Sequence, residues 1–135
     1  MEIKVRAWDK KEKKMIENVG VFYSDNTAYI YKYTSPALGY VEVFVNAKYQ
    51  DRFIPMLYTN CKDIKGKEIY EGDIVSSAYD KLIVAFGNGS FYLKSPSTNS
   101  YMDLSSEIIN WYGLKVIGNV WEHPNLLWGG KNATK

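Results

Sequence analysis

The sequence has few of the side chains on which most catalytic and metal sites depend. Its 135 residues include one cysteine, Cys61, and one histidine, His123. A single cysteine excludes a disulfide within the chain, and one residue of each kind is too few for a zinc site of the usual composition. No Gly-rich segment ends in the Lys-Ser or Lys-Thr pair of a phosphate-binding loop. The residues therefore predict no metal, no cofactor and no catalytic centre.

The sequence also lacks a long hydrophobic run and an excess of one charge. No apolar run approaches the roughly 18 residues of a membrane-spanning helix. Met1 is followed by the charged Glu2 and Lys4, which does not resemble a secretory leader. The 17 Lys and Arg residues nearly balance the 15 Asp and Glu residues, so neither a polybasic arm nor an acidic tail dominates the chain. We expect a soluble cytoplasmic protein with no membrane partner.

Aromatic residues are abundant, and they favour β-strands. The chain has 12 Tyr, 5 Phe and 4 Trp, which is 16% of its residues. Apolar and polar residues alternate at 3–8 and 41–45, and two apolar runs flank Gly87-Asn88-Gly89-Ser90 as in a tight β-hairpin. Because such runs recur at short intervals between turn clusters, the sequence predicts a mainly β fold.

We expect one short helix within this fold, over residues 106–112. Ser105 is a suitable N-cap, Glu107 lies in the first turn, and Gly113 is a suitable stop. The predicted organisation is an N-terminal β-meander at 1–58, packed on a small SH3-like β-barrel at 59–128 that includes the helix. A disordered tail is expected at 129–135.

Three carboxylates lie close together in the centre of the sequence: Glu68, Glu71 and Asp73. A pair of carboxylates can perform acid–base catalysis when their surroundings separate their pKa values. However, Glu71-Gly72-Asp73 between two short apolar runs is also what a tight turn requires. We favour the structural role and keep the carboxylate cluster as a candidate site.

Basic residues gather at the N-terminus, where residues 1–14 hold six Lys or Arg against three Asp or Glu. Such a turn is typical of a solvated surface, but it could also contact phosphates. The candidate partner or nucleic-acid surface consists of Lys4, Arg6, Trp8, Lys10, Lys11, Lys13 and Lys14.

Tyr29, Tyr31 and Tyr33 alternate with Ile30 and Lys32, so they lie on one face of a predicted strand. We predict that this tyrosine face is the inner one. The alternative is that the rings are exposed and stack on bases.

Several segments of the sequence form a specific pattern. The central one is the most specific: Gly66-Lys67-Glu68-Ile69-Tyr70-Glu71-Gly72-Asp73-Ile74-Val75. The others are residues 3–9, 13–15, 58–59, 62–63 and 116–120, with Glu122 and Pro124. Together these segments resemble the YopX family of phage and prophage proteins. Asn60-Cys61 stands where the family tends to have Gly and an aliphatic residue, which favours a structural role for Cys61 because Asn also tolerates a left-handed backbone.

The resemblance implies a protein of a bacterial phage or prophage, located in the host cytoplasm, with no assigned activity and no catalytic residues to carry over. We interpret the chain as a non-enzymatic accessory protein that binds a protein partner or itself, because open sheet edges can pair with another chain. Weak nucleic-acid binding is the alternative.

Overall fold

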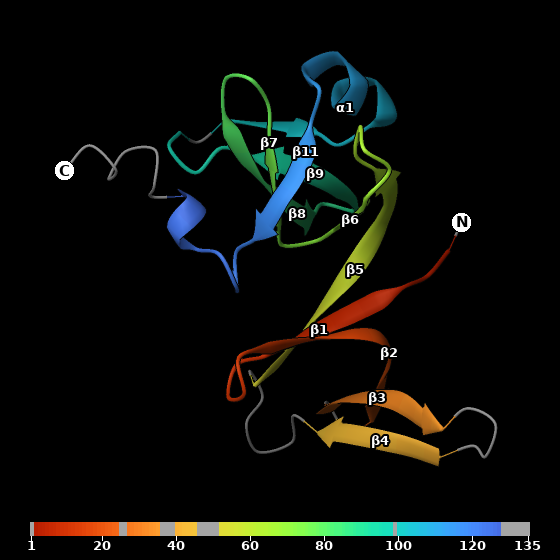
Figure 1. The fold of residues 1–135 in the computed structure, drawn as a ribbon. Coiled ribbons are helices and arrows are strands. Elements are labelled where there is room, and N and C mark those ends of the chain that lie inside the picture. Colours follow the sequence, from red (N-terminus) through yellow and green to blue (C-terminus); the bar gives the residue numbers. More distant parts are fainter. Residues whose placement is uncertain (1, 25–26, 36–39, 46–51, 99, 128–135) are drawn as a thin grey trace. The chain divides into compact units, whose positions relative to one another are not determined.

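The computed structural model describes residues 2–24, 27–35, 40–45, 52–98 and 100–127 (Figure 1). The chain divides into two compact units, Met1–Leu57 and Tyr58–Lys135. The sequence placed its boundary between residues 58 and 59, and the predicted tail at 129–135 lies outside the described residues. Within the described residues, no helix is both long enough and apolar enough to cross a membrane.

The first unit is an antiparallel sheet. Its strands are β1 (Val5–Asp9), β2 (Lys14–Ser24), β3 (Thr27–Ser35) and β4 (Tyr40–Val45), and the first part of β5 (Phe53–Lys62) pairs with β1. The order β4-β3-β2-β1 is that of a meander, and β5 follows β1. β1 is therefore a central strand between β2 and β5.

The core of the first unit lies on the face that carries Ile30. The cluster consists of Ala7, Ile16, Val19, Ile30 and Phe53, with Val5 and Val21 packed against it. The prediction that the tyrosine face of β3 is the inner one is wrong. Ile30 is fully buried, whereas Tyr29 and Tyr31 are only half-buried.

The register of β2 explains this reversal. Val21 pairs with Ile30, so the aliphatic side chains of both strands share one face. Phe22 pairs with Tyr29, and their rings stack with centroids 4.9 Å apart. Phe22 is 48% exposed. Phe22, Tyr29 and Tyr31 therefore lie on the outer face of this ribbon, whereas the side chain of Tyr33 lies outside the described residues.

The second unit contains the second part of β5 and a five-stranded antiparallel sheet. Tyr58 and Lys62 of β5 pair with β6 (Glu68–Tyr70). The sheet has the order β10-β9-β8-β7-β11. Its members are β7 (Asp73–Ser76), β8 (Lys81–Gly87), β9 (Ser90–Lys94), β10 (Tyr101–Asp103) and β11 (Lys115–Asn119).

The mainly β prediction is confirmed, but the SH3-like barrel is not. Among the described residues, β10 and β11 are the two edges of the five-stranded sheet, so the sheet is open. One face of this sheet carries the core, which consists of Ile69, Val75, Leu82, Val84, Leu93, Ile109 and Leu114.

The predicted helix is confirmed as α1 (Ser106–Tyr112). The Ile108 N–H donates to the Ser105 hydroxyl at 3.2 Å, which is the expected N-cap bond. Gly113 ends the helix with a φ of 63°, and its N–H donates to the Ile109 carbonyl. Ile109 is buried in the core, and Ile108 is partly buried against it.

The predicted hairpin is confirmed between β8 and β9. Asn88 and Gly89 have φ values of 52° and 81°, as a two-residue hairpin turn of type I′ requires. Asn60 has a φ of 65° at the point where the register between β5 and β6 shifts. This is the left-handed position that the sequence comparison at Asn60 predicted.

Candidate functional site

The basic turn between β1 and β2 is exposed. Lys10, Lys11, Lys13 and Lys14 all lie at the surface. Lys13 has a φ of 55°, so the chain reverses through a left-handed residue, and its N–H donates to the Asp9 carbonyl at 2.8 Å. Four ammonium groups therefore project from one short turn.

Asp9 organises this turn from the interior. Its Oδ1 accepts hydrogen bonds from the Lys11 and Glu12 N–H groups at 3.0 and 3.2 Å. Arg52 donates Nε to Oδ1 at 2.9 Å and Nη2 to Oδ2 at 3.0 Å, and its guanidinium also lies over the Phe53 ring. The Arg52 hydrogen bonds, helped by the two N–H groups and opposed by burial, lower the pKa of Asp9 below its ordinary value.

The structure does not bring all of the candidate surface together. Arg6 and Trp8 are buried, with only 7% and 6% exposed. Ala7 and Asp9 are buried as well, so successive side chains on both faces of β1 are removed from the surface. Lys4 is half-buried, and its Nζ lies 3.7 Å from Oε2 of Glu2. The exposed part of the candidate surface is therefore the four-lysine turn.

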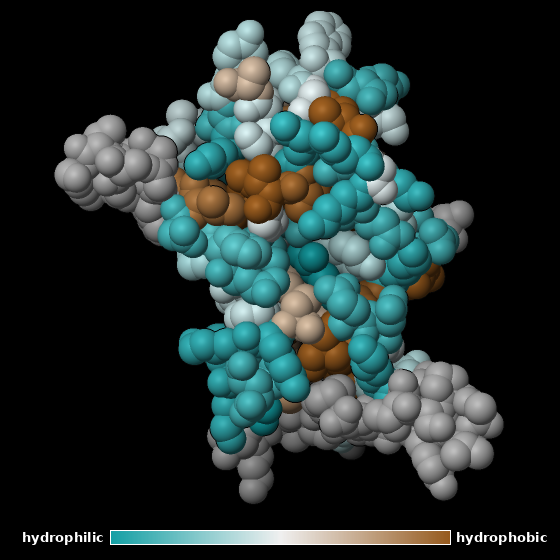
Figure 2. Space-filling view, viewed as in Figure 1, coloured by the Kyte–Doolittle hydropathy of each residue, from teal (hydrophilic) through white to brown (hydrophobic). Residues whose placement is uncertain are grey.

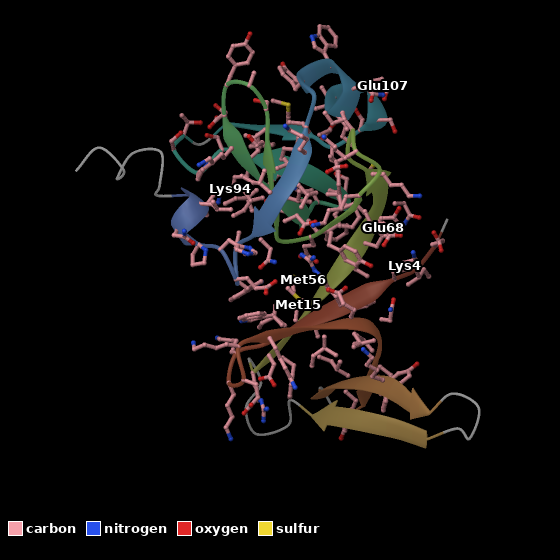
Figure 3. The ribbon with its side chains drawn as sticks, in the orientation of Figure 1. Lys4, Met15, Met56, Glu68, Lys94 and Glu107 are labelled. Atoms are coloured by element: carbon pink, nitrogen blue, oxygen red, sulfur yellow. The ribbon has the colours of Figure 1, made fainter. Side chains whose placement is uncertain are left out.

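The three residues of the carboxylate cluster differ in how far they are buried. Asp73 is buried, and its Oδ2 accepts the Tyr70 N–H at 2.7 Å across the turn that contains Gly72. Gly72 has a φ of 87°, as this tight turn requires. Glu68, labelled in Figure 3, and Glu71 are half-buried. No group of three or more His, Cys, Asp and Glu among the described residues could hold a metal ion.

Asp63 is a buried carboxylate that is not among the candidate site residues of the sequence analysis. Its Oδ1 accepts the Lys65 and Lys67 N–H groups at 2.8 and 2.9 Å, and its Oδ2 accepts the Val116 N–H at 2.8 Å. Burial opposes ionisation, but the three backbone donors outweigh it and lower the pKa of Asp63 below its ordinary value. Asp63 therefore ties the β5–β6 turn to β11.

Cys61 and His123 both make structural contacts. Cys61 is packed against the core of the second unit, and burial raises the pKa of its thiol, which disfavours the nucleophilic thiolate. The Asn119 N–H donates to Nδ1 of His123 at 3.1 Å. The Asn119 side chain also accepts the Trp121 and Glu122 N–H groups at 3.1 and 2.8 Å. These contacts are those of a structural loop.

Trp111 is the most distinctive exposed side chain in the region of the helix. Its exposed fraction is 81%, and its ring stacks on that of Tyr112 with centroids 6.5 Å apart and an interplanar angle of 22°. Tyr112 and Ile64 are 41% and 47% exposed. Ile64 lies beside Gly113, the residue that follows Tyr112, since a Cβ at Gly113 would lie 3.9 Å from Ile64 Cδ1. We call Trp111, Tyr112 and Ile64 the helix patch.

The other described tryptophans are less exposed than Trp111 in the helix patch. Figure 2 shows one face of the molecule, on which hydrophilic residues predominate and hydrophobic patches interrupt them. Trp8 is buried and Trp121 is half-buried, so neither is exposed to the extent of Trp111. The sequence has no signal that would separate the exposed tryptophan from the others.

Comparison with known proteins identifies a family and a fold. The model of the family described as YopX protein matches residues 4–128. A crystal structure of protein EF1440 from Enterococcus faecalis is similar at 28% identity and a TM-score of 0.65, over 94% of this chain and 99% of that one. The crystal structure of protein yopX from Bacillus subtilis is similar at 20% identity and a TM-score of 0.63, over 92% of this chain and 97% of that one. No curated protein matches the chain.

Proposed function

Since the chain belongs to the YopX family, we propose that it is a non-enzymatic accessory protein of a phage or prophage that acts by binding another protein. The exposure of Trp111 is the observation that carries this proposal. Tryptophan is among the residues that contribute most to binding when they are buried at protein interfaces. Trp111 does not belong to the core, to which α1 contributes Ile109 and Ile108.

The helix patch has the composition of the centre of an interface. It combines two stacked aromatic rings with an aliphatic side chain and contains no charged group. Interface centres are enriched in aromatic residues and depleted in charge. Burial of Trp111 alone would remove most of a side-chain area of about 150 to 250 Å² from water. A partner with a complementary apolar pocket would bind here.

Site-specific photo-crosslinking in the bacterial host tests the proposal. A photoreactive phenylalanine analogue replaces Trp111 in one variant and Tyr79 in a second. Tyr79 is a matched control because it is an aromatic residue of the same unit with 91% exposure. We expect a discrete crosslinked protein, either a partner or a second copy, at position 111 and not at position 79.

The crosslink should also depend on the rest of the helix patch. With the analogue at position 111, Ile64→Ser should weaken the crosslink because it removes an apolar neighbour, whereas Phe86→Ser, at a comparable exposure of 46%, should not. Equal labelling at positions 79 and 111, or no labelled protein at all, would contradict a protein-binding role for this patch.

Weak nucleic-acid binding at the basic turn is the second candidate, favoured by the exposure of its four lysines. The aromatic contribution expected from Trp8 is lost because that ring is buried. The exposed Phe22 lies eight residues along β2 from Lys14, or roughly 26 Å at the rise of a strand. Phosphate contacts at the turn would act without nearby base stacking, so any binding should weaken steeply with salt.

Fluorescence anisotropy with single-stranded and duplex oligonucleotides at low salt tests this candidate. Changing Lys10, Lys11, Lys13 and Lys14 to Glu should abolish binding and leave the fold unchanged, because the turn is exposed. No binding by the unmodified protein would exclude the candidate, and binding unchanged in the variant would exclude the turn as its site.

A further inference from the structure

β10 is an open edge of the five-stranded sheet. In the part of the chain that the structure describes, it pairs with β9 on one side and with no strand on the other. Tyr101 and Asp103 are exposed, Tyr101 to 72%, while Met102 between them packs against the core. The edge therefore alternates between two exposed side chains and one that faces inward.

The hydrogen bonds at the two ends of β10 fix the direction of its backbone groups. The Ser95 N–H donates to the Ser100 carbonyl at 3.0 Å, and the Leu104 N–H donates to the Phe91 carbonyl at 3.2 Å. Hydrogen-bonded pairs recur at every second residue of an antiparallel ladder.

It follows that Met102, midway between those two bonds, exchanges hydrogen bonds with its partner Leu93. The N–H and C=O groups of Tyr101 and Asp103 then point away from β9, toward the open edge. The backbone N–H and C=O groups of these two residues are therefore available for hydrogen bonds with an incoming strand.

A cavity of about 330 Å³ lies beside this edge, on the face of the sheet opposite the core. Tyr92 and Tyr101 form an aromatic corner in it, with ring centroids 5.6 Å apart and an interplanar angle of 62°. Lys94, labelled in Figure 3, and Asp103 supply one charge of each sign to its lining. Gly87 leaves space for the Tyr92 ring, whose Cε1 lies 3.3 Å from the position of an added Cβ.

From this edge and cavity we infer that β10 is a docking site for an extended segment of another protein, which adds to the sheet as an antiparallel strand. The residue opposite Asp103 would be basic, and the residue opposite Tyr101 would be aromatic. Residues directly opposite one another share a face of the sheet. Both partner side chains would therefore lie beside the cavity.

The charge of Asp103 indicates that the docked segment is basic. Neither Lys94 nor Asp103 has a hydrogen bond or ion pair with another described side chain, and Asp103 lies at the edge itself. A carboxylate at an open edge repels an acidic strand and attracts a basic one, so it selects among partners. Residues 58–135 hold eight basic and eight acidic residues. Such a balance does not favour a nucleic acid, whose affinity depends on net positive charge.

The test uses a capped synthetic peptide in which lysine, valine and tyrosine follow in that order within a short threonine-rich strand. In an antiparallel register, the lysine lies opposite Asp103 and the tyrosine opposite Tyr101. Nuclear magnetic resonance titration of the full chain should shift the amides of Tyr101 and Asp103 and slow their hydrogen exchange. A second peptide has glutamate in place of the lysine and should bind about two- to tenfold more weakly, since like or opposite charges change cross-strand pairing.

Three variants make the result decisive. Asp103→Lys should reverse the preference between the two peptides, and Asp80→Lys, the same charge change at another exposed acid, should not. Asp103→Pro removes the outward N–H without removing a bond to β9, so the fold should persist and both peptides should lose binding. Unaltered binding to the proline variant, an unchanged preference in Asp103→Lys, or no binding of either peptide at millimolar concentration would overturn the inference.

Self-association of the chain provides a further outcome. If sedimentation shows a dimer that Asp103→Pro dissociates, a second copy occupies the edge and the inference about another protein fails. The result does not depend on the helix patch, because neither Trp111 nor Ile64 is altered in these variants.

Discussion

At the scale of single residues, Asp63 illustrates how one buried carboxylate can hold a loop and a strand together. Replacing it with Asn keeps its size but removes the charge that three N–H groups stabilise. Losing such buried, charge-assisted bonds costs about 1 to 3 kcal/mol. We expect Asp63→Asn to lower the free energy of unfolding by that amount at pH 7, measured by urea denaturation.

The pH dependence of this loss has a definite sign. The pKa of Asp63 in the folded protein is lowered, so its contribution to stability is complete above the ordinary aspartate pKa of about 3.9 and is lost as the pH falls through the folded value. The difference between Asp63→Asn and the unmodified protein should therefore shrink below about pH 4. A difference that grows toward acid pH would contradict the assignment. Asp103→Asn, at an exposed carboxylate, is the matched control.

Two glycines provide a second prediction at this scale, because they are required for different reasons. Gly118 has no room for a side chain: a Cβ would lie 2.7 Å from Nδ1 of His123 and 2.9 Å from Leu126 Cδ1. Gly66 has open space but a φ of 85°. Gly118→Ala should lower the unfolding free energy by about 1 to 3 kcal/mol through overpacking, and Gly66→Ala by about 1 kcal/mol through backbone strain.

Substitution by asparagine distinguishes overpacking at Gly118 from backbone strain at Gly66. It tolerates a left-handed backbone better than alanine does, so Gly66→Asn should recover part of the stability that Gly66→Ala loses. Gly118→Asn adds volume at a crowded position and should be at least as destabilising as Gly118→Ala. Chemical denaturation of the four variants measures both differences, and equal losses for alanine and asparagine at position 66 would show that strain is not the cause there.

At the scale of elements, α1 depends on its caps because it is only seven residues long. Isolated helices of this length are not stable in water, so capping and the burial of Ile109 hold it. Ser105→Ala should lower the unfolding free energy by about 1 kcal/mol, and Ser105→Asp, which retains an acceptor for the Ile108 N–H, should not. Urea denaturation gives these values, and equal losses in both variants would exclude capping as the cause.

The elements with local signals were predictable from the sequence. The helix has a cap residue at each end, and the β8–β9 hairpin has Asn-Gly at its turn, so both were correct. The inner face of β3 was not predictable in this way, because it depends on which residues of β2 lie opposite. Alternation shows that the tyrosines share a face, but the pairing of Val21 with Ile30 decides that this face is the outer one.

The same distinction applies to the candidate sites. The exposed lysine turn follows from its charge, which is a local property. The burial of Arg6 and Trp8 depends on residues distant in the sequence. Met56, which β1 meets by pairing with β5, has its sulfur 3.9 Å from Nη2 of Arg6. The aromatic corner of Tyr92 and Tyr101 likewise depends on the pairing of β9 with β10 across a loop. Sequence patterns identify aromatic and charged residues, but they do not show which of these residues are in contact in the fold.

At the scale of the whole molecule, each of the two units has its own hydrophobic cluster. Ile30 lies in the cluster of the first unit and Leu93 in that of the second, both fully buried, and the two clusters share no residue. Truncating a buried Leu or Ile to Ala costs about 2 to 5 kcal/mol through lost packing and the cavity that remains. We therefore expect Ile30→Ala and Leu93→Ala to destabilise different parts of the chain.

Hydrogen exchange resolved by residue measures this difference. In Leu93→Ala, amide protection should fall most in β7, β8 and β9, and in Ile30→Ala it should fall most in β1, β2 and β3, because local opening follows the cooperative unit to which a residue belongs. Exposed substitutions of similar chemistry, Ile3→Ala in the first unit and Ile117→Ala in the second, serve as controls that leave no buried cavity. If either core variant lowers protection equally in both units, the chain unfolds as one cooperative body, and separate stability of the two units is excluded.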